Sequence, residues 1–551
     1  MSKKTQQESN MHKKVEQYFK KRHGATLDQQ AAHNEEHQAW NRRDFLRMSG
    51  LAAMGSGMML GGFPVSAFSA SPLLNSLNTA ECGDRTLVLI RLKGGNDGLN
   101  TLILRGNDIY YNIRPSLAIQ ENELWGLSSE FGMPNTMQAL EPLWGNGRMQ
   151  VIHNVGYPNQ NYSHFRSSDI WASASDSNEV IKTGWMGRWL ENAYPAFTEA
   201  PPVIPPALQI GVESNLVFRG PESNMALSVS NPQEFYQIAQ TGQLYNMDLL
   251  TNSTPDQELG FVRSMANSAF RYSESIQQAY NNGSNSGDYP GNYLAEQLQI
   301  VARMIKGNLG TKVYMVTIGG FDTHAQQANY HPALVNALAN SVKAFIDDLD
   351  ATGHSQNVLC MTFSEFGRTI YQNGSDGTDH GTGAPVFLFG NDLGSTIVGS
   401  APDLSNLNQY GDPEFSTDFR SVYATVLQDW LCIPTPETDF ALGESFEYIE
   451  GLVPAGSPSL GSNDAAALIG HQAKVEEPGV FNIKFAIKIG GETRIQILSK
   501  DGHPLRTILN EFKEKGSYTL PFNPLQYQLP NGEYIYRLQT GGKVYTKLIK
   551  W

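Results

Sequence analysis

Short apolar runs, each bounded by Gly, Asn or Asp, recur through the middle of the chain. They are continuous and rich in β-branched and aromatic residues, which is typical of strands buried on both faces. Two longer stretches carry apolar residues three and four positions apart, the spacing of amphipathic helices. The strands are predicted at 86–92, 149–153, 312–318, 357–363 and 385–389, and the helices at 292–308 and 332–349. This order predicts an α/β fold, a doubly wound and mostly parallel sheet with helices on both faces.

The pattern changes in two other regions. Residues 195–260 are rich in Pro, Asn and Ser and show little periodicity, so they are predicted to form surface excursions. Residues 451–474 are predicted to form a linker. Beyond them, alternating segments separated by Asp-Gly, Asn-Gly and Gly-Gly pairs predict a small C-terminal antiparallel β-sandwich over 475–551.

The N-terminal residues have the pattern of an export signal. Residues 1–40 are polar and predict a disordered extension. In 41–70, the pair Arg42-Arg43 precedes a short Gly/Ala/Met-rich stretch and then small residues, as in a twin-arginine signal peptide. The apolar stretch is too short to span a bilayer, so no membrane span is expected in the mature chain. The expected location is the periplasm, the cell surface or the medium, reached through an export machinery.

Composition and charge restrict the kinds of partner that the protein can have. The chain has 551 residues and a net charge of −14, and residues 48–474 alone hold 41 acidic against 19 basic side chains. This excess of negative charge argues against nucleic acid as a partner. The three cysteines are too few and too scattered for a disulfide framework, and no Cys-x-x-Cys pair is present.

The residues that could form a functional site lie in three glycine-flanked motifs, 94–98, 319–324 and 377–381. Two of these motifs directly follow a predicted strand, and binding and catalytic sites of open α/β sheets lie at such strand ends. Carboxylate and imidazole groups together suit Zn²⁺, Mn²⁺ or Mg²⁺. The candidate metal ligands are Asp97, Asp322, His324, Glu365, Asp379 and His380. For Asp97 alone, an ordinary Asn-Asp-Gly turn is an equal alternative.

Three further residues are candidates for catalysis. Ser163 could act as a nucleophile and His164 as a ligand or an acid–base group, although Ser163 could equally be the N-cap of a helix. Arg368 could hold an anionic oxygen in two hydrogen bonds, or form an exposed ion pair with Glu365.

Together, the segments Leu-Lys-Gly-Gly-Asn-Asp-Gly, Ser-His-Phe, Gly-Gly-Phe-Asp-Thr-His, Ser-Glu-Phe-Gly-Arg-Thr and Gly-Thr-Asp-His-Gly resemble the DUF1501 family over about residues 85–450. That family is placed in the alkaline phosphatase-like superfamily, which implies two divalent metals at the strand ends. The resemblance implies that Asp97 bridges the metals and that Ser163 stands near the nucleophile position. It further implies that Asp322, His324 and His380 bind one metal and that Glu365 replaces the usual aspartate of the second.

The C-terminal segment Asn-Gly-Glu-Tyr-Ile-Tyr-Arg-Leu and the basic ending resemble the sorting domain of type IX secretion substrates from the Bacteroidetes, with an immunoglobulin-like module as the alternative. The chain lacks the Cys/Ser-x-Pro-x-Arg signature of sulfatases, which disfavours sulfate esters. The predicted function is therefore metal-dependent hydrolysis of a phosphate-type ester on a small molecule or glycan. The alternative is a non-catalytic metal- or glycan-binding surface protein.

Overall fold

The computed structural model describes residues 58–60, 63–65, 82, 84–194, 272–454 and 468–550, with shorter stretches between 202 and 270 and a few positions left out after 477. Residues 1–57 lie outside the described residues. The disordered extension and the twin arginine therefore stay predictions. Inside the predicted signal segment, β1 (Met58–Leu60) and β2 (Phe63–Val65) form an antiparallel pair.

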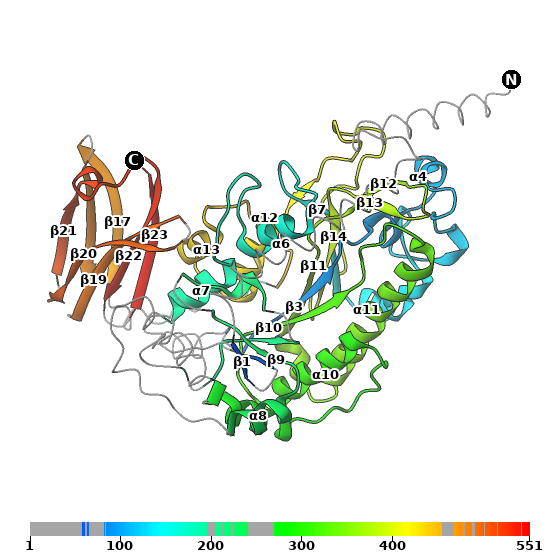
Figure 1. The fold of residues 1–551 in the computed structure, drawn as a ribbon, viewed down its shortest axis with the longest axis horizontal. Helices are drawn as coiled ribbons and strands as arrows, with labels where there is room; N and C mark the ends of the chain where they lie inside the picture. Colours follow the sequence, from blue (N-terminus) through cyan, green and yellow to red (C-terminus); the bar gives the residue numbers. More distant parts are fainter. Residues whose placement is uncertain are drawn as a thin grey trace.

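A nine-stranded sheet forms the centre of the molecule (Figure 1). Its central strands β8 (Ala207–Ile210), β10 (Val313–Gly319), β3 (Thr86–Lys93) and β11 (Val358–Phe363) are parallel, with β9 (Leu227–Val229) beyond β8. The antiparallel strand β14 (Ala384–Phe389) joins β11 to β7 (Met149–Gly156), which pairs in parallel with β15 (Ile397–Val398) and β16 (Thr417–Asp418). All five predicted strands are confirmed, and the sheet is mostly parallel as expected.

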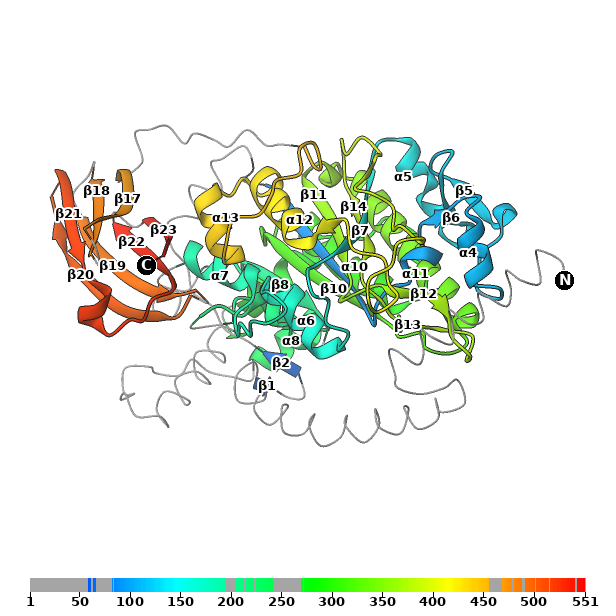
Figure 2. The ribbon, with the colours of Figure 1, turned by 90° about the horizontal axis from the view of Figure 1, so that it is seen from above.

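Helices cover the sheet on two sides. Helices α10 (Tyr293–Lys306) and α11 (Gln327–Asp350) lie on one side, and α6 (His164–Ser173), α7 (Trp185–Ala193) and α12 (Phe419–Thr425) lie on the other (Figures 1 and 2). The Asn292 side chain caps α10 by accepting a hydrogen bond from the backbone N–H of Ala295. The doubly wound fold is thus confirmed, although α11 begins five residues before the predicted start and includes Pro332.

The segment 195–260 differs from its prediction, because it supplies β8 and β9 to the sheet, followed by α8 (Pro232–Gln240). These strands are three and four residues long, too short for a recognisable pattern of buried positions. Smaller elements flank the sheet: β4 (Ile103–Leu104), β5 (Leu124–Gly126), β6 (Phe131–Pro134), α4 (Asp108–Ile113), α5 (Glu141–Gly145) and the ribbon β12 (Arg368–Gln372) with β13 (Thr378–His380).

The C-terminal residues form two antiparallel sheets that share one apolar core. One sheet has the order β17 (Leu468–Glu477), β18 (Val480–Ile487), β21 (Gly516–Phe522), and the other has β20 (Pro504–Lys513), β19 (Gly491–Ser499), β22 (Glu533–Thr540), β23 (Lys543–Lys550). Phe485, Ile497 and Tyr536 meet between them. This is the predicted sandwich, but β17 begins inside the segment assigned to the linker.

A disulfide joins Cys82, just before β3, to Cys432 across 350 residues of sequence. The sequence offers no sign of this pair, because neither cysteine lies in a recognisable spacing. The bond fastens the start of the sheet domain to a segment close to its end. Cys360, in β11, is buried and free.

Helix α13 (Thr435–Leu442) carries a buried acid that makes stability depend on pH. Burial raises the pKa of Glu437 to about 7, and Asp439 nearby adds to the effect. The folded state therefore binds more protons than the unfolded state between the ordinary pKa of Glu and about 7, so this group lowers stability as pH rises through that window. Because Glu437 is only partly buried, we expect Glu437→Gln to raise the free energy of unfolding by about 1–2 kcal/mol at pH 8 and to leave it unchanged near pH 4, in denaturant titrations.

Candidate metal centre

The candidate residues lie in turns that follow the carboxyl ends of parallel strands. The turn after β3 holds Asp97, the turn after β10 holds Asp322, and Glu365 follows β11. The first two turns approach so closely that a Cβ added at Gly94 would lie 2.3 Å from the backbone nitrogen of Asp322. Gly94 also has φ +125°, a conformation that side chains disfavour. The glycine is therefore what allows the strand ends to converge.

Four side chains come together at this edge of the sheet: His164 from the start of α6, Asp322 and His324 from the turn after β10, and His380 from β13. One ligand atom of each lies within 4.8 Å of the others. The Nε2 atoms of the three histidines lie 3.3, 3.1 and 3.4 Å from the same oxygen, Asp322 Oδ1. Three imidazoles thus face one carboxylate oxygen.

The second nitrogen of each imidazole is held by a different partner. His164 Nδ1 lies 3.0 Å from Glu365 Oε1, and His324 Nδ1 lies 3.0 Å from Asp379 Oδ1. His380 Nδ1 lies 2.6 Å from the carbonyl oxygen of Tyr162. These acceptors place the proton on Nδ1 and leave the Nε2 lone pairs facing one another. Metal-binding histidines in proteins are held in this way.

The ionisation of the cluster also suits a cation. Burial lowers the pKa of His380 to about 3, so this imidazole is neutral at physiological pH. Burial opposes the charge of His164, but Asp322 and Glu365 outweigh it and raise the pKa to about 9. Burial also disfavours the charge of Asp322, yet the surrounding imidazoles hold its pKa well below the usual range. Since ligands must be deprotonated, a divalent ion would displace protons here.

The spacing of the ligand atoms fits a single ion. His324 Nε2 and His380 Nε2 are 2.9 Å apart, and each lies 3.1–3.4 Å from Asp322 Oδ1. Four ligands at about 2.0–2.1 Å from a tetrahedral Zn²⁺ are separated by about 3.3–3.4 Å. Only one of the two histidine nitrogens can carry a proton at this distance, or a cation can lie between them, because the 2.9 Å separation is that of a hydrogen bond. A donor set of imidazole and carboxylate suits Zn²⁺ or Mn²⁺ better than Mg²⁺.

Two predicted ligands lie in a second layer around this cluster. Glu365 and Asp379 point at the outer nitrogens of His164 and His324, and Glu365 Oε1 also accepts the backbone N–H of Gly94 at 2.8 Å. They orient the imidazoles, and the cluster does not include their oxygens. His164, for which the sequence leaves open a ligand or an acid–base role, does contribute a nitrogen to the cluster.

Asp97 lies elsewhere, in a fully buried network. Its Oδ2 accepts hydrogen bonds from Arg114 Nη1 at 2.6 Å and from Gln327 Nε2. Burial raises the pKa of Asp97, but Arg114 outweighs this and holds it below the ordinary value. A guanidinium already neutralises this carboxylate, so the structure does not support the expected bridge between two metals. No motif in the sequence indicates Arg114 as the partner, although it lies only 17 residues after Asp97.

Arg368 is not available to hold an anionic substrate. Its Nε donates to the carbonyl of Gly95 at 2.8 Å and its Nη1 to that of Thr378 at 2.9 Å. Its Nη2 donates to the carbonyls of Gly94 and Phe321 and to Asp322 Oδ1. The guanidinium is buried, so it clamps the turns of the site together. The alternative, an exposed ion pair with Glu365, is also wrong.

Ser163 occupies the N-cap position of α6, next to His164 in the chain. Its backbone N–H donates to Asn161 Oδ1 at 2.9 Å, while its hydroxyl makes no capping hydrogen bond. The helix-start alternative is correct for the backbone. The unused hydroxyl keeps Ser163 a candidate nucleophile.

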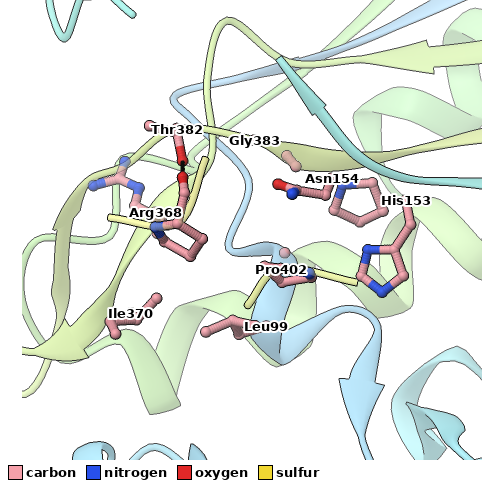
Figure 3. Close-up of a pocket in the computed structure, with 12 residues that line it drawn as sticks. Leu99, His153, Asn154, Arg368, Ile370, Thr382, Gly383 and Pro402 are labelled. Atoms are coloured by element: carbon pink, nitrogen blue, oxygen red, sulfur yellow. Dashed lines mark hydrogen bonds between the residues drawn. The ribbon is translucent and has the colours of Figure 1, made fainter. Parts of the chain in front are cut away.

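A small cavity of about 20 Å³ lies behind Arg368 (Figure 3). His153 and Asn154 line one side of it, and Arg368 and Ile370 line the other. Burial lowers the pKa of His153 to about 4, so its ring is neutral. The cavity has the size of one water molecule, and the ring of His153 is not part of the metal cluster.

Fold and site define an α/β protein with a histidine–aspartate cluster at the carboxyl edge of its sheet. The chain belongs to the DUF1501 family, described as "Protein of unknown function (DUF1501)", whose profile matches residues 148–449. This confirms the resemblance seen in the sequence. Comparison with curated proteins gives no match.

Solved structures with a similar arrangement include PsFucS1 sulfatase from Pseudoalteromonas sp., 10% identical over 82% of this chain and 86% of that one, with a TM-score of 0.30. The alkaline phosphatase from the Antarctic bacterium TAB5 is 10% identical over 57% and 94%, with a TM-score of 0.24. A protein in the alkaline phosphatase superfamily from Vibrio parahaemolyticus is 8% identical over 90% and 86%, with a TM-score of 0.30. Likenesses at this level carry no argument about the reaction of this chain.

Proposed function

We propose that this chain is an exported metal-dependent hydrolase of phosphate-type esters. The observation that carries the proposal is the convergence of three anchored imidazoles on Asp322 Oδ1. Catalytic zinc sites use three protein ligands and leave one position open. We assign Asp322, His324 and His380 as the ligands. A divalent ion bound there supplies Lewis acidity, which stabilises negative charge developing on the ester oxygens.

His164 serves as the acid–base group in this proposal. Glu365 accepts the proton of its Nδ1 at 3.0 Å, which directs Nε2 toward the cluster. His164 Nε2 lies 3.3 Å from Asp322 Oδ1 without the alignment of a hydrogen bond, so it can face a substrate atom. It would hold the proton that the leaving oxygen needs. The nucleophile would be the hydroxyl of Ser163 or a water molecule; once His164 has given its proton to the leaving oxygen, its free Nε2 would take up the proton that the nucleophile loses.

Replacing His164 separates its two possible roles. We expect His164→Gln to keep metal bound within a few-fold of the wild-type affinity while hydrolysis falls about 10²–10⁴-fold, the range of general acid–base groups. Metal content by mass spectrometry and turnover of 4-nitrophenyl phosphate would be measured on the same preparation. Loss of the ion in this variant would make His164 a fourth ligand and refute the acid–base role.

The choice of ester rests on a direct comparison. Turnover of 4-nitrophenyl phosphate well above that of 4-nitrophenyl sulfate would support the phosphate assignment, and the reverse order would contradict it. A small-molecule ester and a glycan-linked one remain the two substrate types to compare.

The buried position of Arg368 favours a second candidate function, a metal- or glycan-binding surface protein without turnover, because the expected anion-holding group is already engaged. Stoichiometric metal with no hydrolysis of any ester would favour it.

Export is supported by the disulfide, because such bonds persist in oxidising compartments. Among the helices in the described part of the chain, none has the length and apolarity needed to cross a membrane. We propose that the twin-arginine segment directs passage through the inner membrane. In this proposal the C-terminal sandwich acts as the sorting module at the outer one.

A further inference from the structure

The loop formed by residues 408–413 contacts the first of two segments that position His380. Asp412, fully buried, accepts the hydroxyl hydrogen of Tyr162 at 3.0 Å through Oδ2. The carbonyl of the same Tyr162 accepts the Nδ1 proton of His380 at 2.6 Å. Asp412 is therefore two hydrogen bonds away from a proposed metal ligand.

The loop reaches the other side of His380 as well. Thr382 follows His380 by two residues, and its hydroxyl donates to the carbonyl of Pro413 at 2.6 Å. Figure 3 shows this bond at the wall of the small cavity, where it holds the Thr382 side chain. The loop is thus bonded both to Tyr162, whose carbonyl accepts the His380 proton, and to the chain two residues after His380.

The loop is itself well fixed. The Asn408 side chain accepts the backbone N–H of Tyr410 at 2.8 Å and that of Asp412 at 3.2 Å. The Tyr410 ring packs edge to face against Tyr162, with centroids 5.9 Å apart. A buried carboxylate on a braced loop can therefore hold the tyrosine, and its carbonyl, in one place.

We propose that Asp412 is a positioning residue for the metal centre, acting through Tyr162 on the imidazole of His380. The inference rests on the proposed metal site. The Tyr162 carbonyl selects the Nδ1–H tautomer of His380 and so directs the Nε2 lone pair at Asp322 and His324. Partners outside the ligand shell that orient imidazoles typically change metal affinity by 10–100-fold.

The test is a double-mutant cycle on metal affinity. Zn²⁺ affinity would be measured by competition with a chromophoric chelator for the wild type, Tyr162→Phe, Asp412→Ala and the double variant. Each single variant is expected to raise Kd about tenfold. Because both substitutions remove the same hydrogen bond, the Kd of the double variant should be no higher than that of the single variant with the higher Kd. The visible spectrum of the Co²⁺ forms should change with the affinity.

Two variants control for a merely structural role. Asp412→Asn keeps an acceptor oxygen and should recover most of the affinity, whereas Asp403→Asn, an exposed residue in the preceding turn, should leave it unchanged. A Kd within twofold of wild type in both Tyr162→Phe and Asp412→Ala, or losses that multiply in the double variant, would overturn the proposal. If Asp412→Ala does not fold, Tyr162→Phe with an unchanged Kd overturns it alone. A wild-type chain that binds neither Zn²⁺ nor Mn²⁺ would instead refute the metal centre.

Discussion

Asp322→Ala is expected to abolish metal binding and to reduce hydrolysis at least a thousandfold. Asp322 Oδ1 lies within 3.4 Å of all three imidazoles, so its removal takes the only carboxylate from the cluster. Lewis acidity contributes several kcal/mol to such reactions, which corresponds to about 10³ in rate. Metal content and turnover of 4-nitrophenyl phosphate are the measurements.

The loss should come from the site rather than from unfolding. The Asp322 side chain is half exposed, and Arg368 keeps its bonds to four backbone carbonyls without it. The melting temperature of the metal-free variant should therefore stay close to that of the metal-free wild type. Asp392→Ala, at an exposed turn, is the matched control and should retain metal and turnover. Full activity in Asp322→Ala would refute the metal centre.

Breaking the disulfide is expected to have the largest effect on stability. A bond that closes a loop of 350 residues restricts the unfolded chain strongly; the loop-entropy relation gives about 6 kcal/mol, and measured disulfide contributions reach about 5 kcal/mol. We therefore expect the free energy of unfolding of the sheet domain to fall by about 4–5 kcal/mol on reduction, as measured by denaturant titration with and without dithiothreitol.

The matched control is the variant that cannot form the bond. Cys82→Ser with Cys432→Ser should show the lowered stability already without reductant and should not respond to dithiothreitol. Cys360 is free and buried, so it remains in both proteins. An equal response of wild type and double variant to the reductant would show that the effect lies outside the Cys82–Cys432 bond.

The strands could be predicted from the sequence because their signal is local. Apart from Lys312 and Thr317, the run 312–318 is apolar because both faces of β10 are covered, and this condition appears in the order of residues itself. The short strands β8 and β9 carry no such pattern, and the disulfide depends on two residues brought together only by the fold. Pairings of that kind require the three-dimensional structure.

The sequence predicted which residues gather at the site, but not which of them form the inner cluster and which surround it. Glycine-flanked carboxylates and imidazoles after strands correctly indicated Asp322, His324 and His380 as neighbours. Whether a carboxylate faces the centre of the cluster or the outer nitrogen of a histidine depends on side-chain direction, so the sequence does not show that Glu365 and Asp379 contact the outer nitrogens of His164 and His324. Asp97 and Arg368 have other roles than the sequence predicts, for another reason. Asp97 is paired with Arg114, and Arg368 donates to four backbone carbonyls; no sequence motif indicates these buried partners.

The most direct test is the metal content of the purified mature chain, from about residue 71, determined by inductively coupled plasma mass spectrometry after exhaustive dialysis. A single centre built from Asp322, His324 and His380 predicts about one zinc or manganese ion per chain. No ion, even after reloading with each metal, would contradict the centre. Two ions per chain would contradict the assignment of Asp97 and Glu365 to supporting roles.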